Sequence, residues 1–182
     1  MRFIALFLLA LAPLLPQAAS AQDAPGRVGR VSHTEGPVAV YQDPETGWEK
    51  AYVNSPITSE NSLWTEPRSR AEVRVSGTAL RLDGATQLDI ARLDDESLHA
   101  SLVRGSLGVR VRHDDFADRF LVDTPEARFT VRREGRYRID VDPDRGETRL
   151  AVFEGEARMA RVRMSAPQRR TVRVDFIRVM LP

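Results

Sequence analysis

The sequence predicts an all-β fold, a single two-layer β-sandwich or flattened β-roll of many short strands. From Val28 onward apolar residues recur with period two, which is the pattern of strands that bury one face. Turn-forming residues separate these runs about every ten residues, a spacing typical of sandwiches, barrels and rolls. No apolar run of helical period competes with the alternation. A chain of 182 residues with 42% hydrophobic residues can bury one core but is short for two domains.

The alternating runs indicate which side chains face the core. These are Val73, Val75, Leu80, Leu82, Leu88, Ile90, Leu107, Val109, Phe120, Val122, Phe129, Val131, Ile139, Val141, Leu150 and Val152. Glycine, proline, aspartate and asparagine predict turns at 36–37, 43–44, 54–56, 76–77, 83–84, 104–105, 124–125, 134–135, 142–146 and 154–155. Trp48 and Trp64 open two strands of this pattern. For both we expect packing in the core, with stacking on a sugar or a partner as the alternative.

The first 21 residues have the features of a secretory signal peptide. Arg2 gives a positive start, residues 3–15 form an apolar run, and Ala19, Ser20 and Ala21 form an A-x-A cleavage site. A membrane anchor is the alternative, but the run is shorter than the roughly 20 residues that span a bilayer. We therefore expect a signal peptide at 1–21, a tether at 22–29, one β domain at 30–160, and a C-terminal strand or loosely attached tail at 161–182.

Composition narrows the class of function. The chain has 27 basic and 26 acidic residues, and removal of Arg2 with the signal leaves 26 of each. A balanced charge on an exported chain excludes nucleic acid as the expected partner. We expect a soluble periplasmic protein without stable membrane insertion after cleavage. The absence of cysteine excludes thiol catalysis and cysteine metal sites.

Ordered landmarks between residues 30 and 158 carry a family resemblance. They include L-W-T at 63–65, R-G-S-L-G-V-R-V at 104–111, F-L-V-D-T-P at 120–125 and V-F-E-G-E-A at 152–157. Together they resemble the periplasmic FecR domain, in the secreted form that lacks the cytoplasmic anti-sigma segment. The resemblance implies a non-catalytic module that senses or binds a partner. It does not identify the ligand, because a fold does not fix a function.

Alternating aspartates form one candidate metal site. Asp140, Asp142 and Asp144 are similar to the oxygen ligands of a calcium loop. The sixth and twelfth positions of such a loop carry Arg145 and Ala151 here, where glycine and glutamate belong. An ordinary hairpin turn is therefore the favoured interpretation, and calcium or other metal binding is an alternative function.

A second polar cluster contains His113, Asp114, Asp115 and Asp118. A histidine beside carboxylates can act as a base or bind a metal, but one histidine makes a poor site. We favour a solvated connection between two strands. Because no G-x-S-x-G, H-E-x-x-H or glycine-rich phosphate loop is present, we predict no enzyme and no cofactor, and keep a role in envelope hydrolysis as a second alternative.

Arginines at alternate positions give the candidate binding residues, Arg136, Arg138, Arg149 and Arg158. Period two places them opposite the core on the closing strands, where they would form one face suited to anionic groups. Interspersed acids also allow the simpler interpretation of a solvated face. The partner expected on such a face is an envelope protein or an anionic envelope polymer.

Overall fold

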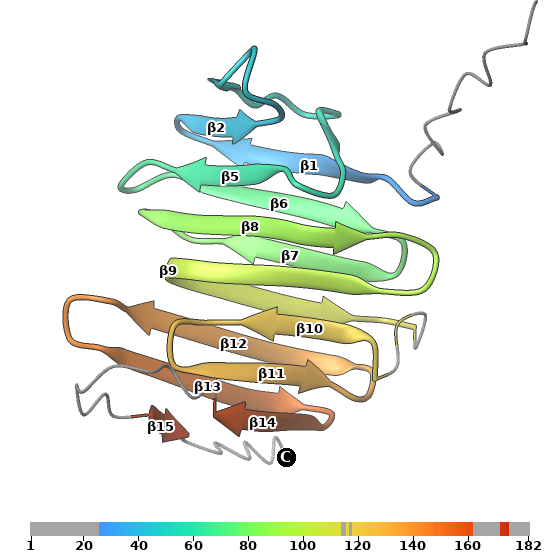
Figure 1. Ribbon diagram of the computed structural model, residues 1–182, viewed down its shortest axis with the longest axis vertical. Helices are drawn as coiled ribbons and strands as arrows, with labels where there is room; N and C mark the ends of the chain where they lie inside the picture. The colour runs from blue at the N-terminus through green and yellow to red at the C-terminus, as the bar shows by residue number, and fades with distance from the viewer. Residues whose placement is uncertain (1–25, 114–115, 117, 162–171, 175–182) are drawn as a thin grey trace, which may run out of the picture.

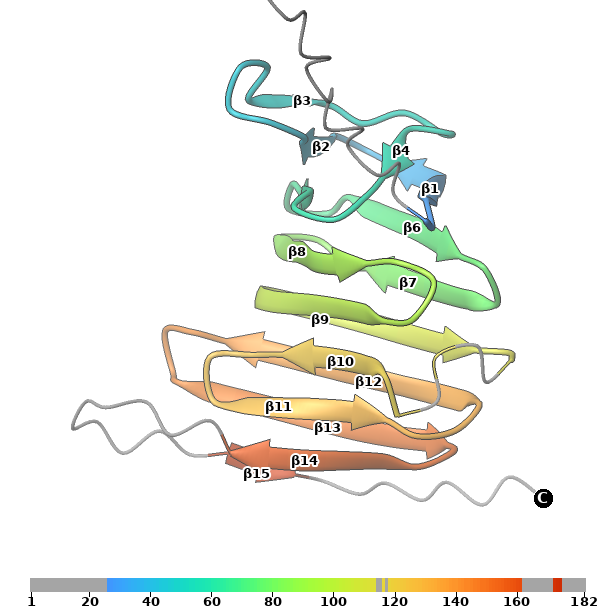
Figure 2. The same cartoon turned by 45° about the vertical axis from the view of Figure 1, so that its right-hand side comes forward.

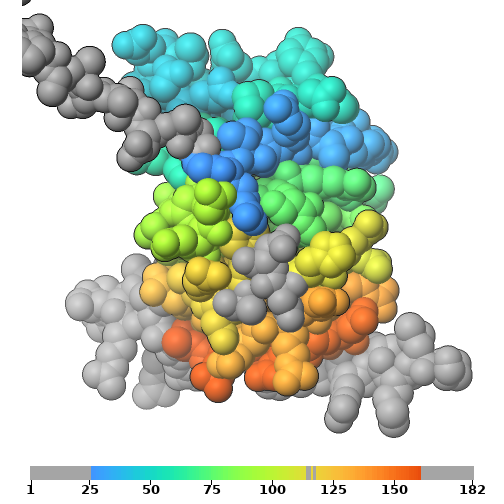
Figure 3. Space-filling model, turned by 90° about the vertical axis from the view of Figure 1, so that its right-hand side faces the viewer, coloured from blue at the N-terminus to red at the C-terminus, as the bar shows by residue number. Residues whose placement is uncertain are grey.

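The computed structural model describes residues 26–113, 116, 118–161 and 172–174, and every regular element in them is a β-strand. The strands stack as rungs along the long axis of the molecule (Figure 1). In the space-filling view cyan residues form one end of the molecule and blue residues lie below them; green, yellow and orange-red residues then follow along the axis (Figure 3). Beyond the first strands, the chain therefore adds its rungs in sequence order. The signal peptide predicted at 1–21 lies outside the described residues.

Two layers face each other across the core (Figures 1 and 2). The layer nearer the viewer in Figure 1, the front layer, contains β2 (Val38–Tyr41), β3 (Trp48–Lys50), β5 (Ser62–Thr65), β8 (Thr86–Leu93), β10 (Phe120–Asp123), β11 (Ala127–Val131) and β14 (Ala157–Arg161). The back layer contains β1 (Gly29–Glu35), β4 (Pro56–Ile57), β6 (Arg70–Val75), β7 (Thr78–Leu82), β12 (Gly135–Asp142), β13 (Glu147–Glu154) and β15 (Val172–Val174). Most neighbouring strands are antiparallel.

Strand β9 (Leu98–Val111) belongs to both layers. Its first half pairs with β8 and β10, and its second half pairs with β7 and β12. The two layers are therefore parts of one curled sheet, which confirms the all-β, two-layer prediction in its rolled form.

The predicted turn at residues 104–105 is wrong, because β9 continues through it and bends. Gly105 makes the bend possible with a φ of +89°, a conformation that L side chains rarely adopt. A Cβ there would lie 2.3 Å from Thr86 Oγ1 and 2.8 Å from the Ala85 carbonyl. A glycine that looks like a turn signal in the sequence is thus the corner of a continuous strand.

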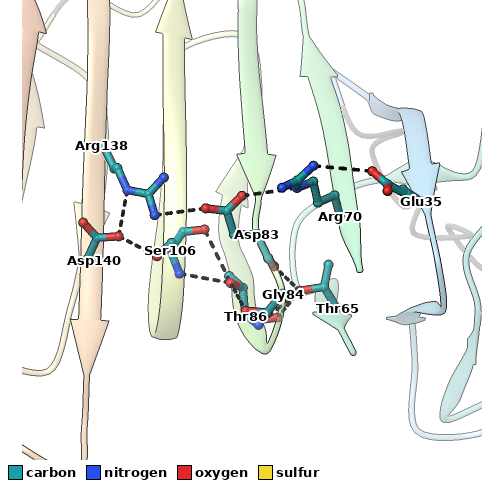
Figure 4. Close-up of polar contacts among 9 residues, drawn as sticks. All are labelled: Glu35, Thr65, Arg70, Asp83, Gly84, Thr86, Ser106, Arg138 and Asp140. Atoms are coloured by element: carbon teal, nitrogen blue, oxygen red, sulfur yellow. Dashed lines mark hydrogen bonds and ion pairs between the residues drawn. The ribbon is translucent and has the colours of Figure 1, made fainter. Parts of the chain in front are cut away.

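Buried threonine side chains form hydrogen bonds with the backbone at the bend of β9 (Figure 4). The Ser106 amide donates to Thr86 Oγ1 at 3.0 Å, and the Thr86 amide donates to Thr65 Oγ1 at 3.1 Å. Thr65 in turn donates to the Asp83 carbonyl. These bonds satisfy backbone groups that the bend removes from the regular ladder, since an unpaired buried amide is destabilising.

The predicted core is confirmed at every position except Val152, which is only partly buried. Val152 lies on β13. The described part of β15 pairs with β13 only at residues 148–150, so no described strand flanks Val152 on that side. The core also contains Leu98, Ala100 and Leu102 from the first half of β9. Sequence reasoning did not assign that half to a strand.

The predicted C-terminal tail is described only in part. Part of the predicted tail, β15, pairs in parallel with β13, and the rest of 162–182 lies outside the described residues. Within the part of the chain that the structure describes, no helix has the length and apolarity needed to cross a membrane.

Candidate functional site

The outward face of the back layer carries rows of side chains fixed by strand register. One row runs across the sheet through Glu72, Arg81, Gly108, Arg138 and Ala151. These residues come from β6, β7, β9, β12 and β13. Paired positions place their side chains on the same face, so they are neighbours in space although 79 residues separate the first from the last in number.

The next row contains Arg74, Ala79, Arg110, Arg136 and Glu154. Its arginines lie on either side of the small Ala79, and its one acid lies at the end. Two adjacent rows therefore bring arginines from β7, β9 and β12 around Gly108.

A shallow groove of about 280 Å³ opens at this point. It is lined by Arg81, Gly108, Val109, Arg110, Arg136, Tyr137, Arg138 and Phe153. Gly108 makes the hollow, because the nearest atom to a Cβ placed there would be Arg81 Cβ at 3.6 Å. Phe153, which is 40% exposed, gives the groove an apolar wall.

The arginines of the groove differ in how their charges are matched. Arg81 Nε lies 2.7 Å from Glu72, and Arg136 Nε lies 3.4 Å from Glu154. Arg138 contacts both Asp140, at 2.9 Å, and Asp83, at 3.0 Å. Arg110 has no ion pair among the described residues, so the centre of the groove retains an excess positive charge.

Glu72 holds one side of this face in place. Burial would raise the pKa of Glu72, but hydrogen bonds from Arg81, Arg74 and Ser32 outweigh it and hold the pKa at about 2. The carboxylate is therefore ionised at neutral pH and orients Arg81 at the edge of the groove.

A chain of ion pairs borders the groove on the side of the corner (Figure 4). Arg70 lies 3.6 Å from Glu35 and 3.8 Å from Asp83, and Asp83 contacts Arg138. Asp140 then contacts Arg138 and accepts a hydrogen bond from Ser106. These ion pairs connect β1, β6, β9 and β12, and they orient the Arg138 side chain.

The segment of the candidate calcium loop is the end of β12 and the hairpin turn that leads to β13, as favoured from the sequence: Asp140 and Asp142 lie on β12, and Asp144 lies in the turn. Asp142 accepts hydrogen bonds from the amides of Asp144 and Arg145, both at 3.1 Å. Asp140 is engaged by Arg138 and Ser106. In residues 26–113, 116, 118–161 and 172–174 no three histidine, aspartate or glutamate side chains are grouped to hold a metal ion.

Two of the four residues of the second polar cluster, His113 and Asp118, lie within the described residues. Asp118 lies 3.0 Å from Arg132, and His113 packs beside Gly77. Asp114 and Asp115 lie outside the described residues, so this prediction stays untested.

Among the described residues, His99 has a carboxylate partner, since its Nε2 lies 2.8 Å from Asp123 Oδ2. Arg128 also donates two hydrogen bonds to Asp123, at 2.6 and 2.8 Å, and together with His99 it lowers the pKa of that carboxyl despite partial burial. Among the contacts of the described residues, no hydroxyl nucleophile bonds to the His99 ring. The pair joins β9 to β10, and it does not form a nucleophile–base set.

The four predicted arginines do not form one face, which corrects the sequence prediction. Arg136, Arg138 and Arg149 point outward from the back layer, whereas Arg158 lies on β14 of the front layer opposite Thr130. The chain changes layer at Gly155, whose φ is +95°. Period two gives the direction of a side chain relative to its own sheet, but it does not say which sheet.

Arg149 lies apart from the groove as well. It contacts Glu147 at 3.5 Å and lines a separate polar hollow beside the β12–β13 turn. Sequence reasoning missed Arg81 and Arg110, which complete the groove from β7 and β9. Their alternation with apolar residues showed that they point outward, but only the register between strands distant in sequence places them beside Arg136.

The family model described as FecR protein matches residues 61–158, from β5 to β14. The chain belongs to the FecR family. No curated protein and no solved structure matches it. The matched segment contains the whole groove, and FecR is a regulatory, non-catalytic family, which agrees with a non-enzymatic role.

Proposed function

We propose that this FecR domain is a non-catalytic module of the bacterial periplasm that binds an acidic segment of a partner protein in the groove at Gly108. The observation that carries the proposal is Arg110, which has no ion pair among the described residues and lies in a hollow lined by three further arginines. Export rests on the signal features of residues 1–21.

The chemistry of the groove favours a carboxylate beside an apolar group. Guanidinium is planar and donates paired hydrogen bonds that match a carboxylate. Arg110 and Arg136 come from directly paired positions of β9 and β12, so one carboxylate can reach both. Phe153 offers an apolar contact on the same side of the sheet. A peptide chain supplies both groups, whereas a uniformly charged polymer supplies only the first.

The lining also argues against chemistry at this site. Its side chains are arginines, valine, tyrosine and phenylalanine, which include no carboxylate, histidine or hydroxyl of a serine or threonine. The Tyr137 hydroxyl is turned to the Arg133 carbonyl, to which it donates at 2.8 Å. Hence the groove can bind and orient a ligand but lacks a nucleophile with a base beside it.

The test is capture of partners from an envelope extract with two double variants of equal charge. Arg110→Ser with Arg136→Ser removes the groove cations, and Arg149→Ser with Arg158→Ser removes two exposed arginines elsewhere. We expect only the groove variant to lose the captured protein, and capture by the parent protein to weaken as salt rises. Equal capture by both variants would contradict the proposal.

Two additions sharpen the test. Gly108→Leu should fill the groove without strain, because its Cβ has free space and its φ lies outside the left-handed region. This variant should remain folded but should no longer bind the partner.

Protease treatment of the extract distinguishes a protein partner from an anionic polymer. Capture that survives the treatment would show that the partner is a polymer.

A further inference from the structure

The outward face of the front layer has a different composition from the groove face. Three aromatic residues, Trp48, Tyr41 and Trp64, project from the adjacent strands β3, β2 and β5. Tyr41 pairs directly with Trp48, and Trp64 pairs with Ala39, two residues from Tyr41 on the same face. The three rings therefore lie on one side of the sheet.

The sequence-based expectation that both tryptophans pack in the core is wrong. Trp48 is 50% exposed, and Trp64 is only half-buried. Neighbouring Val38, Val40 and Leu63 fill the inward positions of the same strands. Strand β3 is the last strand at its edge of the described sheet, so no neighbouring strand flanks Trp48 on that side.

The rings of Tyr41 and Trp48 lie against each other at an angle. The ring centroids of Tyr41 and Trp48 lie 5.7 Å apart with a 57° angle between their planes. Beyond them, Lys50 Nζ lies 5.1 Å from the centre of the Tyr52 ring, which is on a residue 60% exposed. Exposed aromatic side chains that lie together on one face are a common feature of ligand-binding surfaces.

Hydrogen-bonding groups border the rings on the next strand. Ser62 and Trp64 of β5 pair with Asp89 and Gln87 of β8, so all four point outward together. Gln87 donates to Asp89 at 3.2 Å, and Trp64 Nε1 donates to Glu66 at 3.0 Å. The half-buried Gln87 and Asp89 and the exposed Glu66 can form further hydrogen bonds next to the flat faces of the rings.

A pyranose ring presents the matching chemistry, with C–H groups on its flat face and hydroxyls around its edge. The C–H face packs on tryptophan or tyrosine, and the hydroxyls bond to carboxylates and amides. The charges near the rings, Asp89 and Glu66 against Lys50, disfavour an acidic sugar. We propose that the front face of β3, β2, β5 and β8 binds a neutral polysaccharide chain.

This site is independent of the groove at Gly108, because it lies on the opposite layer and shares no residue with it. A domain with both sites would hold a glycan on one face and a protein on the other. The failure of either proposal would leave the other standing.

The test is calorimetric titration of the purified protein with chitohexaose and with cellohexaose, both neutral chains of β-linked pyranose rings. We expect saturable binding of at least one of them. Trp48→Ala should weaken it about three- to tenfold, as expected for one lost aromatic contact. The variant should fold, because the side chain lies half in water.

Phe153→Ala is the matched control, since it removes an exposed aromatic ring from the other layer. It should leave saccharide binding unchanged, as should Arg110→Ser. Absence of binding to both oligosaccharides would overturn the proposal. Binding that Trp48→Ala leaves intact would overturn it too, and so would tighter binding of an acidic oligosaccharide such as oligogalacturonate at the same face.

Discussion

The two outward faces of the roll share one backbone pattern but differ in chemistry. Behind both faces, inward positions carry valine, leucine, isoleucine and phenylalanine. Outward positions of the back layer carry arginines and acids around the glycine groove, whereas those of the front layer near β3 carry aromatic rings. Alternation thus leaves every second residue free of the core, and function can differ between faces without a change in fold.

The largest expected effect separates inward from outward positions on one strand. Ile139 is buried in β12 between β9 and β13. Ile139→Asp should lower the free energy of unfolding by about 4 kcal/mol or more, because it buries an unpaired charge in the core. Urea denaturation followed by circular dichroism measures this.

The outward control for that variant is Arg110→Asp on the adjacent strand, which has no ion pair among the described residues. It should change the free energy of unfolding by about 0.5 kcal/mol or less. Similar losses from both variants would show that the assignment of the two faces is incorrect.

The second prediction compares two glycines of β9. Gly105→Ala should be destabilising by about 2–4 kcal/mol, because its Cβ would lie 2.6 Å from Thr86 Cα and its φ is +89°. Gly108→Ala should be neutral or slightly stabilising, by about 0.5 kcal/mol, since an alanine fits an open strand position. Thermal unfolding of both variants measures the difference, and equal melting temperatures would contradict the corner assignment.

The third prediction concerns pH and Glu72. Its pKa in the folded state, about 2, lies below the ordinary value of 4.5, so ionised Glu72 stabilises the fold above about pH 4.5 and this contribution is lost as pH falls towards 2. Glu72→Gln should be destabilising by about 1–2 kcal/mol at pH 7, through the loss of its charged hydrogen bonds.

Urea midpoints of the parent protein and of Glu72→Gln should therefore differ at pH 7 and converge near pH 2. Glu49→Gln is a matched control, because Glu49 is exposed on β3. A gap for Glu72→Gln that stays constant over this pH range would contradict the role of the carboxylate.

The smallest expected effect distinguishes matched from unmatched arginines in the groove. Arg81→Ser removes a 2.7 Å contact with Glu72 and should be destabilising by about 0.5–1 kcal/mol. Arg110→Ser should change stability by less than about 0.3 kcal/mol, because the described residues give it no acidic partner. Paired urea titrations at low salt resolve this difference, and a larger loss for Arg110→Ser would indicate that Arg110 has a structural role.

Much of the fold could be predicted from the sequence because alternation is a local property. Ile139, Leu107 and Val73 were assigned inward from their neighbours alone, and all are buried. Errors arose where the local signal was ambiguous. Gly105 suggests a turn in the sequence, because a glycine that bends a continuous strand and a glycine that reverses the chain give the same sequence signal.

The candidate groove was only partly predictable. Alternation identifies Arg136 and Arg138 from their position opposite the core, but it also groups Arg158 with them, although Arg158 lies on the other layer. Trp48 was assigned to the core from its place at a strand start. Its exposure follows from β3 being the last strand at its edge, which depends on the order of strands and not on their residues.

The sequence by itself determined that this chain forms short strands with one wet face and that it carries the landmarks of the FecR family. Period-two alternation and turn propensity depend on residues close together in the chain, so both can be recognised in the sequence alone. Only the tertiary structure decided which outward residues meet. The register of β7, β9 and β12 brings Arg81, Arg110 and Arg136 around Gly108, and that register is set by burial of the whole core, to which residues far apart in the chain contribute together.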